Sequence, residues 1–251
     1  QWSRNPACWS GTQSRGGPLM RRLPYDWIDW GVWSNGNKPL VLSFGGYHLW
    51  SEWGLSNHNG SLSLQWKPNT NFNLSLSPAY EVDRNPAQWL ANVADPAQSA
   101  TYGTRHLFGR LDQKTISCSV RLNWIFSPQL SLQAYIQPFI AVGAYDGFKE
   151  LLRPRSWDFL EYGSGASTLV REQGRCVIDP GDGGEPIVLA DPDFNYKSLR
   201  GTVVLRWEYR LGSTLYLVWT QSRADYRDPG DLSLGRDLGS MLRAPGDNIF
   251  M

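Results

Sequence analysis

The sequence has no long apolar run, little net charge and no recognisable catalytic motif. No run approaches the roughly 18 apolar residues that a membrane-spanning helix needs, so a helical membrane protein is excluded. The formal net charge of +1 gives no electrostatic reason to expect nucleic acid as a partner. The three histidines lack a metal-ligand spacing, and no G-x-S-x-G elbow is present. We therefore do not expect this chain to be an enzyme.

Cysteine is scarce, with Cys8, Cys118 and Cys176 only, so the three cannot all pair with one another. Cys118 lies in an apolar alternation and is most simply a small hydrophobic residue. One bridge is left to consider, between Cys8 and Cys176, and no sequence feature decides whether it forms.

Aromatic residues are abundant: the chain has 13 tryptophans, 11 tyrosines and 9 phenylalanines. This content fits platforms that stack on sugars, a dense core, or belts at a membrane interface, where one ring edge is apolar and the other wet. Composition alone does not separate these three possibilities.

The clearest pattern is a strict alternation of apolar and polar residues around a tight turn at 127–129. A period of two places all apolar side chains on one face of a β-sheet and all polar ones on the other. The apolar positions before and after the turn are Ile116, Cys118, Val120, Leu122, Trp124, Leu130, Leu132, Ala134, Ile136 and Ile140.

Similar alternation recurs along the chain and predicts an all-β, antiparallel up-and-down meander. Residues 1–24 are expected to be loop, and 84–104 and 143–197 long excursions, with a small hairpin at 168–172 and 176–178. The strands are expected at 25–33, 40–50, 61–66, 72–82, 105–126, 130–142, 202–209 and 215–221.

The predicted connections sort by length, because short turns fall at one end of the sheet and long loops at the other. Outer-membrane barrels have this asymmetry, with short periplasmic turns and long extracellular loops. Trp66, Trp124 and Trp207 each precede a short turn and a Leu-x-Leu segment, where a membrane-interface belt of aromatic residues would lie. The sequence thus favours part of a transmembrane β-barrel, with the lipid bilayer as partner.

On the polar face of these strands, charged and amide side chains recur at every second position. They are typical of a barrel lumen, and equally of the solvated face of a two-layer sandwich. Glu208 with Arg206 and Arg210 could set selectivity in a pore or form a structural ladder, and the sequence favours neither. The polar and aromatic side chains of this face could form a binding track for a sugar, but an unspecialised lining of the barrel lumen explains them more simply. The candidate lumen residues are Arg121, Asn123, Gln133, Tyr135, Gln137, Arg206, Glu208 and Arg210.

Acidic residues gather in a glycine-rich part of the long excursion. Their carboxylates are hard oxygen ligands that suit Ca²⁺, but the spacing does not follow the EF-hand pattern, and a solvated acidic loop is the simpler interpretation. We therefore expect no cofactor, with a weak candidate calcium site at Asp179, Asp182, Glu185, Asp191 and Asp193.

Several segments resemble an uncharacterised bacterial outer-membrane family. Its members combine an N-terminal, family-9-type carbohydrate-binding domain with a large C-terminal β-barrel of unknown function. The segments include Arg15-Gly16-Gly17-Pro18, Ala94-Asp95-Pro96, Thr101-Tyr102-Gly103, Leu122-Asn123-Trp124, Gln137-Pro138-Phe139, Asp191-Pro192-Asp193-Phe194-Asn195 and Arg206-Trp207-Glu208-Tyr209-Arg210.

The resemblance implies a single barrel domain over residues 1–251, located in the outer membrane of a Gram-negative bacterium. The carbohydrate-binding-like domain is expected upstream of Gln1 and a closing strand after Met251. The implied role is a passive transport pore for carbohydrate or another small solute, or a surface anchor for the carbohydrate-recognising module. Two other hypotheses are a soluble all-β carbohydrate-binding module and an accessory domain of a glycoside-processing enzyme.

Overall fold

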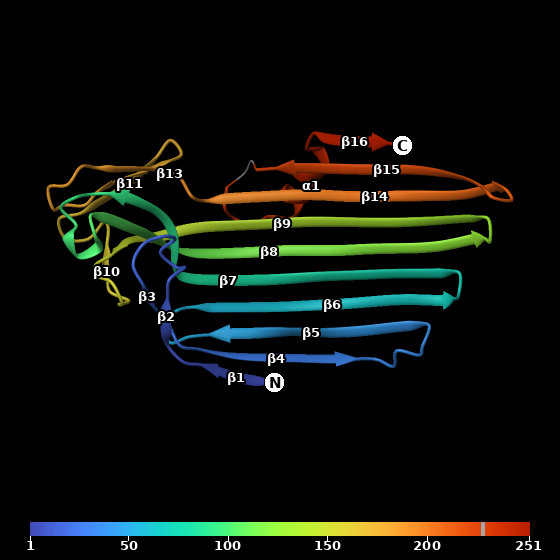
Figure 1. Cartoon of the computed structure of the whole chain (residues 1–251), viewed down its shortest axis with the longest axis horizontal. Helices are drawn as coiled ribbons and strands as arrows, with labels where there is room; N and C mark the ends of the chain where they lie inside the picture. Colours follow the sequence, from blue (N-terminus) through green and yellow to red (C-terminus); the bar gives the residue numbers. More distant parts are fainter. Residues whose placement is uncertain (227–228) are drawn as a thin grey trace.

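The computed structural model describes residues 1–226 and 229–251. One antiparallel sheet dominates this part of the chain, in the order β1-β4-β5-β6-β7-β8-β9-β14-β15-β16 (Figure 1). No hydrogen-bonded pairing joins β1 to β16 among the described residues, so the sheet has two open edges. Its strands are β1 (Trp2–Asn5), β4 (Tyr25–Trp33), β5 (Leu40–Trp50), β6 (Ser56–Asn69), β7 (Phe72–Ala94), β8 (Thr104–Ser127), β9 (Leu130–Leu151), β14 (Phe194–Arg210), β15 (Ser213–Asp225) and β16 (Gly246–Phe250).

The connections between these strands sort by length as predicted. The short turns at 34–39, 70–71, 128–129 and 211–212 lie together at one end of the sheet, and the longer connections lie at the other (Figure 1). The predicted long strand at 105–126 is confirmed as β8.

Two predictions about the loops were wrong. Residues 1–24 contain β1, β2 (Cys8–Ser10) and β3 (Met20–Arg22) rather than loop alone. β7 and β9 continue well beyond their predicted ends, so the excursions shorten to 95–103 and 152–193. The second excursion contains β10 (Phe159–Glu161), β11 (Thr168–Glu172), β12 (Arg175–Asp179) and β13 (Ile187–Ala190). The small hairpin predicted at 168–172 and 176–178 is confirmed, because β11 and β12 pair antiparallel.

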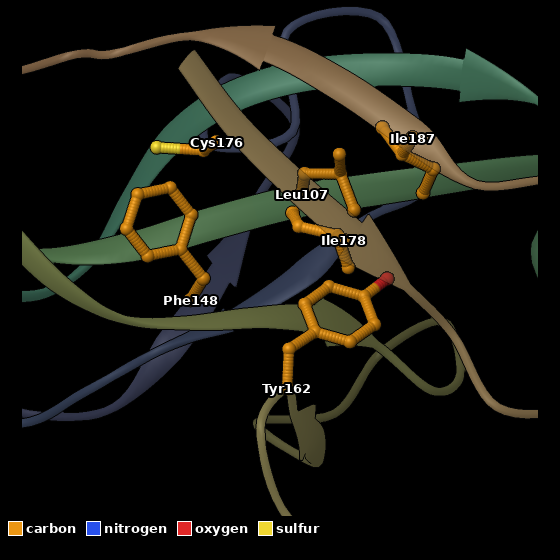
Figure 2. Close-up of a cluster of buried hydrophobic side chains, with 6 residues drawn as sticks. All are labelled: Leu107, Phe148, Tyr162, Cys176, Ile178 and Ile187. Atoms are coloured by element: carbon orange, nitrogen blue, oxygen red, sulfur yellow. The ribbon is translucent and has the colours of Figure 1, made fainter. Parts of the chain in front are cut away.

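The long-loop end forms a compact unit, which we call the cap and define as residues 6–24, 85–112 and 143–193. In it, the three-stranded sheet β11-β12-β13 lies against the extended ends of β7, β8 and β9. The cluster in Figure 2 joins these layers through Leu107, Phe148, Tyr162, Cys176, Ile178 and Ile187. A second buried cluster contains Met20, Ala87, Phe108 and Leu151, with Trp157 and Phe159 packed against it.

A buried arginine ties the cap together. Arg105 on β8 is 2% exposed. Its Nε donates a hydrogen bond to Asp95 at 2.7 Å, and its Nη1 donates to both carboxylate oxygens of Glu150 at 2.9 Å. A third carboxylate, Asp182, accepts from the same guanidinium at 2.5 Å. Because these groups come from three separate segments, the charge of Arg105 holds the long excursion against the ends of β7 and β8.

The rest of the sheet has no comparable core. We call residues 25–84, 113–142 and 194–225 the sheet region; in it, the buried hydrophobic residues are Ile140, Ala141 and Val142, next to the cap. Large apolar side chains elsewhere on one face are exposed, including Val32 at 68% and Leu217 at 52%. A single sheet layer with no second layer over this face accounts for the exposure.

One helix, α1 (Leu234–Arg243), lies over the cap end of that apolar face and contacts β14 and β15. Its buried Asp237 accepts a hydrogen bond from Asn195 Nδ2 at 3.1 Å, and Lys197 Nζ donates to Asn195 Oδ1 at 3.0 Å. The helix therefore covers polar side chains that would otherwise interrupt the apolar face. It exposes a stripe of its own, made of Leu234, Leu238 and Leu242.

All three cysteines are free. Cys8 is exposed, whereas Cys176 is buried in the cluster of Figure 2, so the bridge considered between them does not form.

Candidate functional site

The polar face of the sheet region carries the most extensive group of aligned polar side chains. Arg121 on β8 is the register partner of Tyr135 on β9, and Tyr135 is the partner of Thr202 on β14. The three line an open cavity of about 500 Å³, and Asn123 and Gln133 line it as well. The Arg121 guanidinium lies 5.2 Å from the centroid of the Tyr135 ring, which is within the range of a cation–π contact.

The other candidate lumen residues extend this group toward both ends of the strands. Gln137 lies opposite Arg200, on the cap side of the cavity. Toward the short turns, Arg206 pairs with Glu208 at 3.2 Å, and the second oxygen of Glu208 accepts the Gly212 N–H at 3.2 Å. Arg210 is exposed next to the turn, beyond a register shift between Glu208 and Arg210.

A row of serines continues the polar face across β5 to β8, and no motif in the sequence marks it as a site. Ser43 pairs in register with Ser63, and Ser77 with Ser119. A second open cavity of about 360 Å³ lies over them, and Arg121 borders it as it borders the first. In the sequence these serines alternate with leucines, which indicates strands. Only the register between the strands reveals that the hydroxyls of four strands form one surface.

Together these two cavities make a hydrogen-bonding track across the sheet, which we call the polar track. Hydroxyl, amide and phenol groups supply both donors and acceptors. Arg121 adds a positive charge that no carboxylate within 4 Å neutralises among the described residues. Such a surface can hold water and polar solutes.

The predicted aromatic positions lie on the opposite, apolar face, near the short turns. The ring of Phe72 lies between those of Trp66 and Trp124, with centroid distances of 5.2 and 5.5 Å. Trp207 lies on the same face, opposite Leu130 in the register, with Tyr209 6.0 Å away. The sequence thus placed the three tryptophans at one end of the sheet, and the register adds Phe72 to their row.

The acidic residues of the long excursion do not meet as one group. Asp182 binds Arg105, and this hydrogen bond lowers the pKa of the Asp182 carboxyl. Asp191 and Asp193 instead lie near Arg171, at 3.6 and 3.2 Å. Asp179 accepts the Gly181 N–H in its own turn. No group of three or more His, Cys, Asp or Glu residues in the described part of the chain is arranged to hold a metal ion.

Within the described ranges, no helix is both long enough and apolar enough to cross a membrane. The fold defines an antiparallel all-β protein organised around one large sheet with a polar and an apolar face.

Residues 22–251 match the model of a family described as a domain of unknown function, DUF5916, and the chain belongs to this family. No match to the chain was found among curated proteins or among solved structures.

Proposed function

We propose that the sheet region forms part of the wall of an outer-membrane β-barrel, with its apolar face against lipid and its polar track against an aqueous lumen. The observation that carries the proposal is the uncovered apolar face. A soluble two-layer sandwich would bury these side chains between its sheets. Six leucines of the apolar face distinguish a barrel wall from a sandwich, because a sandwich would bury them. None of the six is buried: Leu62, Leu64, Leu130, Leu132, Leu205 and Leu217.

The length of the apolar rows supports a bilayer as the missing partner. On β8 the row runs from Ile116 to Phe126, and on β9 from Leu130 to Ile140. Ten residue steps at about 3.3 Å span roughly 33 Å along a strand. A strand tilted by about 40° reaches roughly 25 Å in height, which is the height of the apolar band of outer-membrane barrels.

The ends of the band also fit this placement. The row of Trp66, Phe72 and Trp124 lies near the short turns, where aromatic belts mark the periplasmic interface. At the other end, α1 exposes its leucine stripe beside the apolar face. An amphipathic helix of this kind is stabilised by lying at the boundary between headgroups and acyl chains.

The polar track gives the barrel its proposed task, the passive passage of polar solutes. Alternating lumen residues tune selectivity in such barrels, and Arg121 would favour anionic or hydrogen-bonding solutes. The open edges at β1 and β16 require further strands for closure, because an unpaired edge exposes backbone groups that cannot be satisfied in lipid. The alternative role, a surface anchor for a carbohydrate-recognising module, is supported by the family resemblance alone.

Membrane fractionation with site-specific labelling tests the proposal. Ile136 and Gln137 are neighbours in β9 on opposite faces, so they form a matched pair. In a Cys8→Ser, Cys118→Ser background, Ile136→Cys and Gln137→Cys would each carry a fluorophore; Cys176 is buried and does not compete.

We expect the protein to require detergent for extraction. A label at position 136 should be quenched by a lipid-soluble quencher, and a label at 137 by a water-soluble one. A protein that extracts without detergent, or two labels with the same quenching, would contradict the proposal.

A further inference from the structure

A third cavity, of about 530 Å³, lies at the long-loop end, away from the polar track. Three segments that are distant in sequence meet there: the β2–β3 hairpin, the connection after β5, and the turn at 153–158. Its volume falls within the roughly 300–1,000 Å³ typical of small-molecule sites. The side chains that matter are Trp9, Trp53, Trp157, Arg21, Arg153 and Arg155.

Backbone hydrogen bonds fix the position of these segments. The N–H of Arg21 donates to Ser156 O at 3.1 Å, and the N–H of Arg155 donates to Leu19 O at 2.7 Å. Trp9 is the register partner of Arg21 in the β2–β3 hairpin, so the two side chains are neighbours on one face. The turn is thus docked onto β3, and the cavity is built on paired backbone.

One of the three tryptophans is anchored in the cap. Trp157 packs edge to face on Phe159, with centroids 5.1 Å apart, and Phe159 packs in turn on the buried Phe108. Trp157 therefore presents a fixed aromatic surface to the cavity. Trp9 and Trp53 are 58% and 54% exposed at its margin.

The charge of the cavity is positive. Arg153 is neutralised by Asp158, with Nε and Oδ2 2.6 Å apart. No carboxylate in residues 1–226 or 229–251 lies within 4 Å of the guanidinium of Arg21 or Arg155. The site thus combines aromatic surfaces with two guanidinium groups able to form paired hydrogen bonds to an anionic oxygen group.

We propose that this cavity binds an acidic saccharide, a sugar ring that carries a carboxylate or a sulfate. The apolar C–H face of a pyranose ring stacks on tryptophan, while Arg21 and Arg155 bind the acidic group. A simple anion leaves the tryptophans unused, and a neutral sugar leaves the arginines unpaired. The proposal does not depend on the membrane placement, because the cavity belongs to the cap and its neighbouring loop.

Titration calorimetry on the purified protein tests the site, in detergent or in buffer as its extraction requires. The probe is a trimer of galacturonic acid, the neutral counterpart is a trimer of galactose, and inorganic sulfate is the simple anion. We expect binding of the acidic trimer at or below about 1 mM, and binding of the other two at least about tenfold weaker.

Exposed side chains allow variants that leave the fold intact. Arg21→Gln and Trp53→Ala should each weaken the acidic trimer by about tenfold. Arg175→Gln and Trp2→Ala remove an exposed arginine and an exposed tryptophan that do not line the cavity, and should leave affinity unchanged. Circular dichroism confirms that each variant is folded.

Each negative result contradicts a different part of the proposal. No binding of the acidic trimer overturns the site. Equal binding of the neutral trimer overturns the role of the arginines, and equal binding of sulfate overturns the role of the tryptophans. A protein that extracts without detergent yet binds the acidic trimer would overturn the barrel and leave this site standing.

Discussion

The cap and the sheet region are built from the same long strands, yet large apolar side chains are buried in the cap and exposed in the sheet region. Phe148 on β9 is 1% exposed in the cap, whereas Phe44 on β5 in the sheet region is 53% exposed. Alternation alone therefore does not make a core. The cap buries its residues because β11, β12 and β13 supply a second layer, and the sheet region has none.

This difference implies that the two regions depend on their surroundings in different ways. The cap carries its own apolar interior and a buried charge centre at Arg105, so its stability is internal. The apolar face of the sheet region has no such interior among the described residues. Substitutions on matched positions can separate the two cases.

The largest effect is expected in the cap core. Phe148→Ala removes a fully buried ring, and the lost burial and residual cavity should lower the free energy of unfolding by about 3–5 kcal/mol. Leu152→Ala, on an exposed side chain nearby, should cost no more than about 0.5 kcal/mol. Hydrogen exchange of the cap amides measures both, and equal losses would show that the cap is not held by this core.

An intermediate effect is expected from a charge on the apolar face. Ile136→Arg should destabilise the protein in phospholipid vesicles by about 2–4 kcal/mol, the cost of a cation near the bilayer midplane. Gln137→Arg, one position further on the opposite face, should change stability by much less. Reversible urea unfolding in vesicles measures the difference, and similar values for the two variants would contradict the assignment of the faces.

The smallest effect concerns the pH dependence of the cap. The hydrogen bond from Arg105 lowers the pKa of Asp182 below its ordinary value near 4. A carboxyl whose pKa is lower in the folded state contributes stability above its unfolded pKa, and this contribution is lost as pH falls through the folded pKa.

Cap stability should therefore decline as pH falls below about 4, by no more than about 1 kcal/mol because Asp182 is 43% exposed. Asp182→Asn should weaken that decline. Asp179→Asn, in the same loop without an arginine partner, should keep it. Thermal unfolding of the cap between pH 5 and pH 3 gives the comparison, and a wild-type slope in Asp182→Asn would refute it.

The sheet region was predictable from sequence because its signal is local. Strict alternation fixed both the strands and their faces, as at Arg121 and Tyr135, and short turns fixed the order of pairing. The aromatic row was predictable for the same reason, since Trp66 and Trp124 each precede a turn.

Most of the cap was not predictable, because its long strands break the period; the exception is the hairpin of β11 and β12, which the sequence predicted at 168–172 and 176–178. Register shifts between Asn85 and Gln88 and between Trp89 and Ala91 interrupt the alternation on β7, so this segment resembled a loop. The strands β2 and β3 have three residues each, too few for a period. Outside the cap, the helix α1 was not predicted either, because it contains Gly235 and Gly239, which lower helix propensity. The cavity beside Trp157 arises from segments distant in sequence, which no local pattern connects.

The order of the strands has a further consequence for how this fold can vary. From β4 to β9 each strand is hydrogen-bonded to the next one along the chain, without a crossover. A hairpin such as β4–β5 can therefore be gained or lost as a unit, and the remaining strands keep their order and the face of the sheet on which each side chain lies. The number of hairpins thus sets the width of the sheet, independently of the cap that β7, β8 and β9 support.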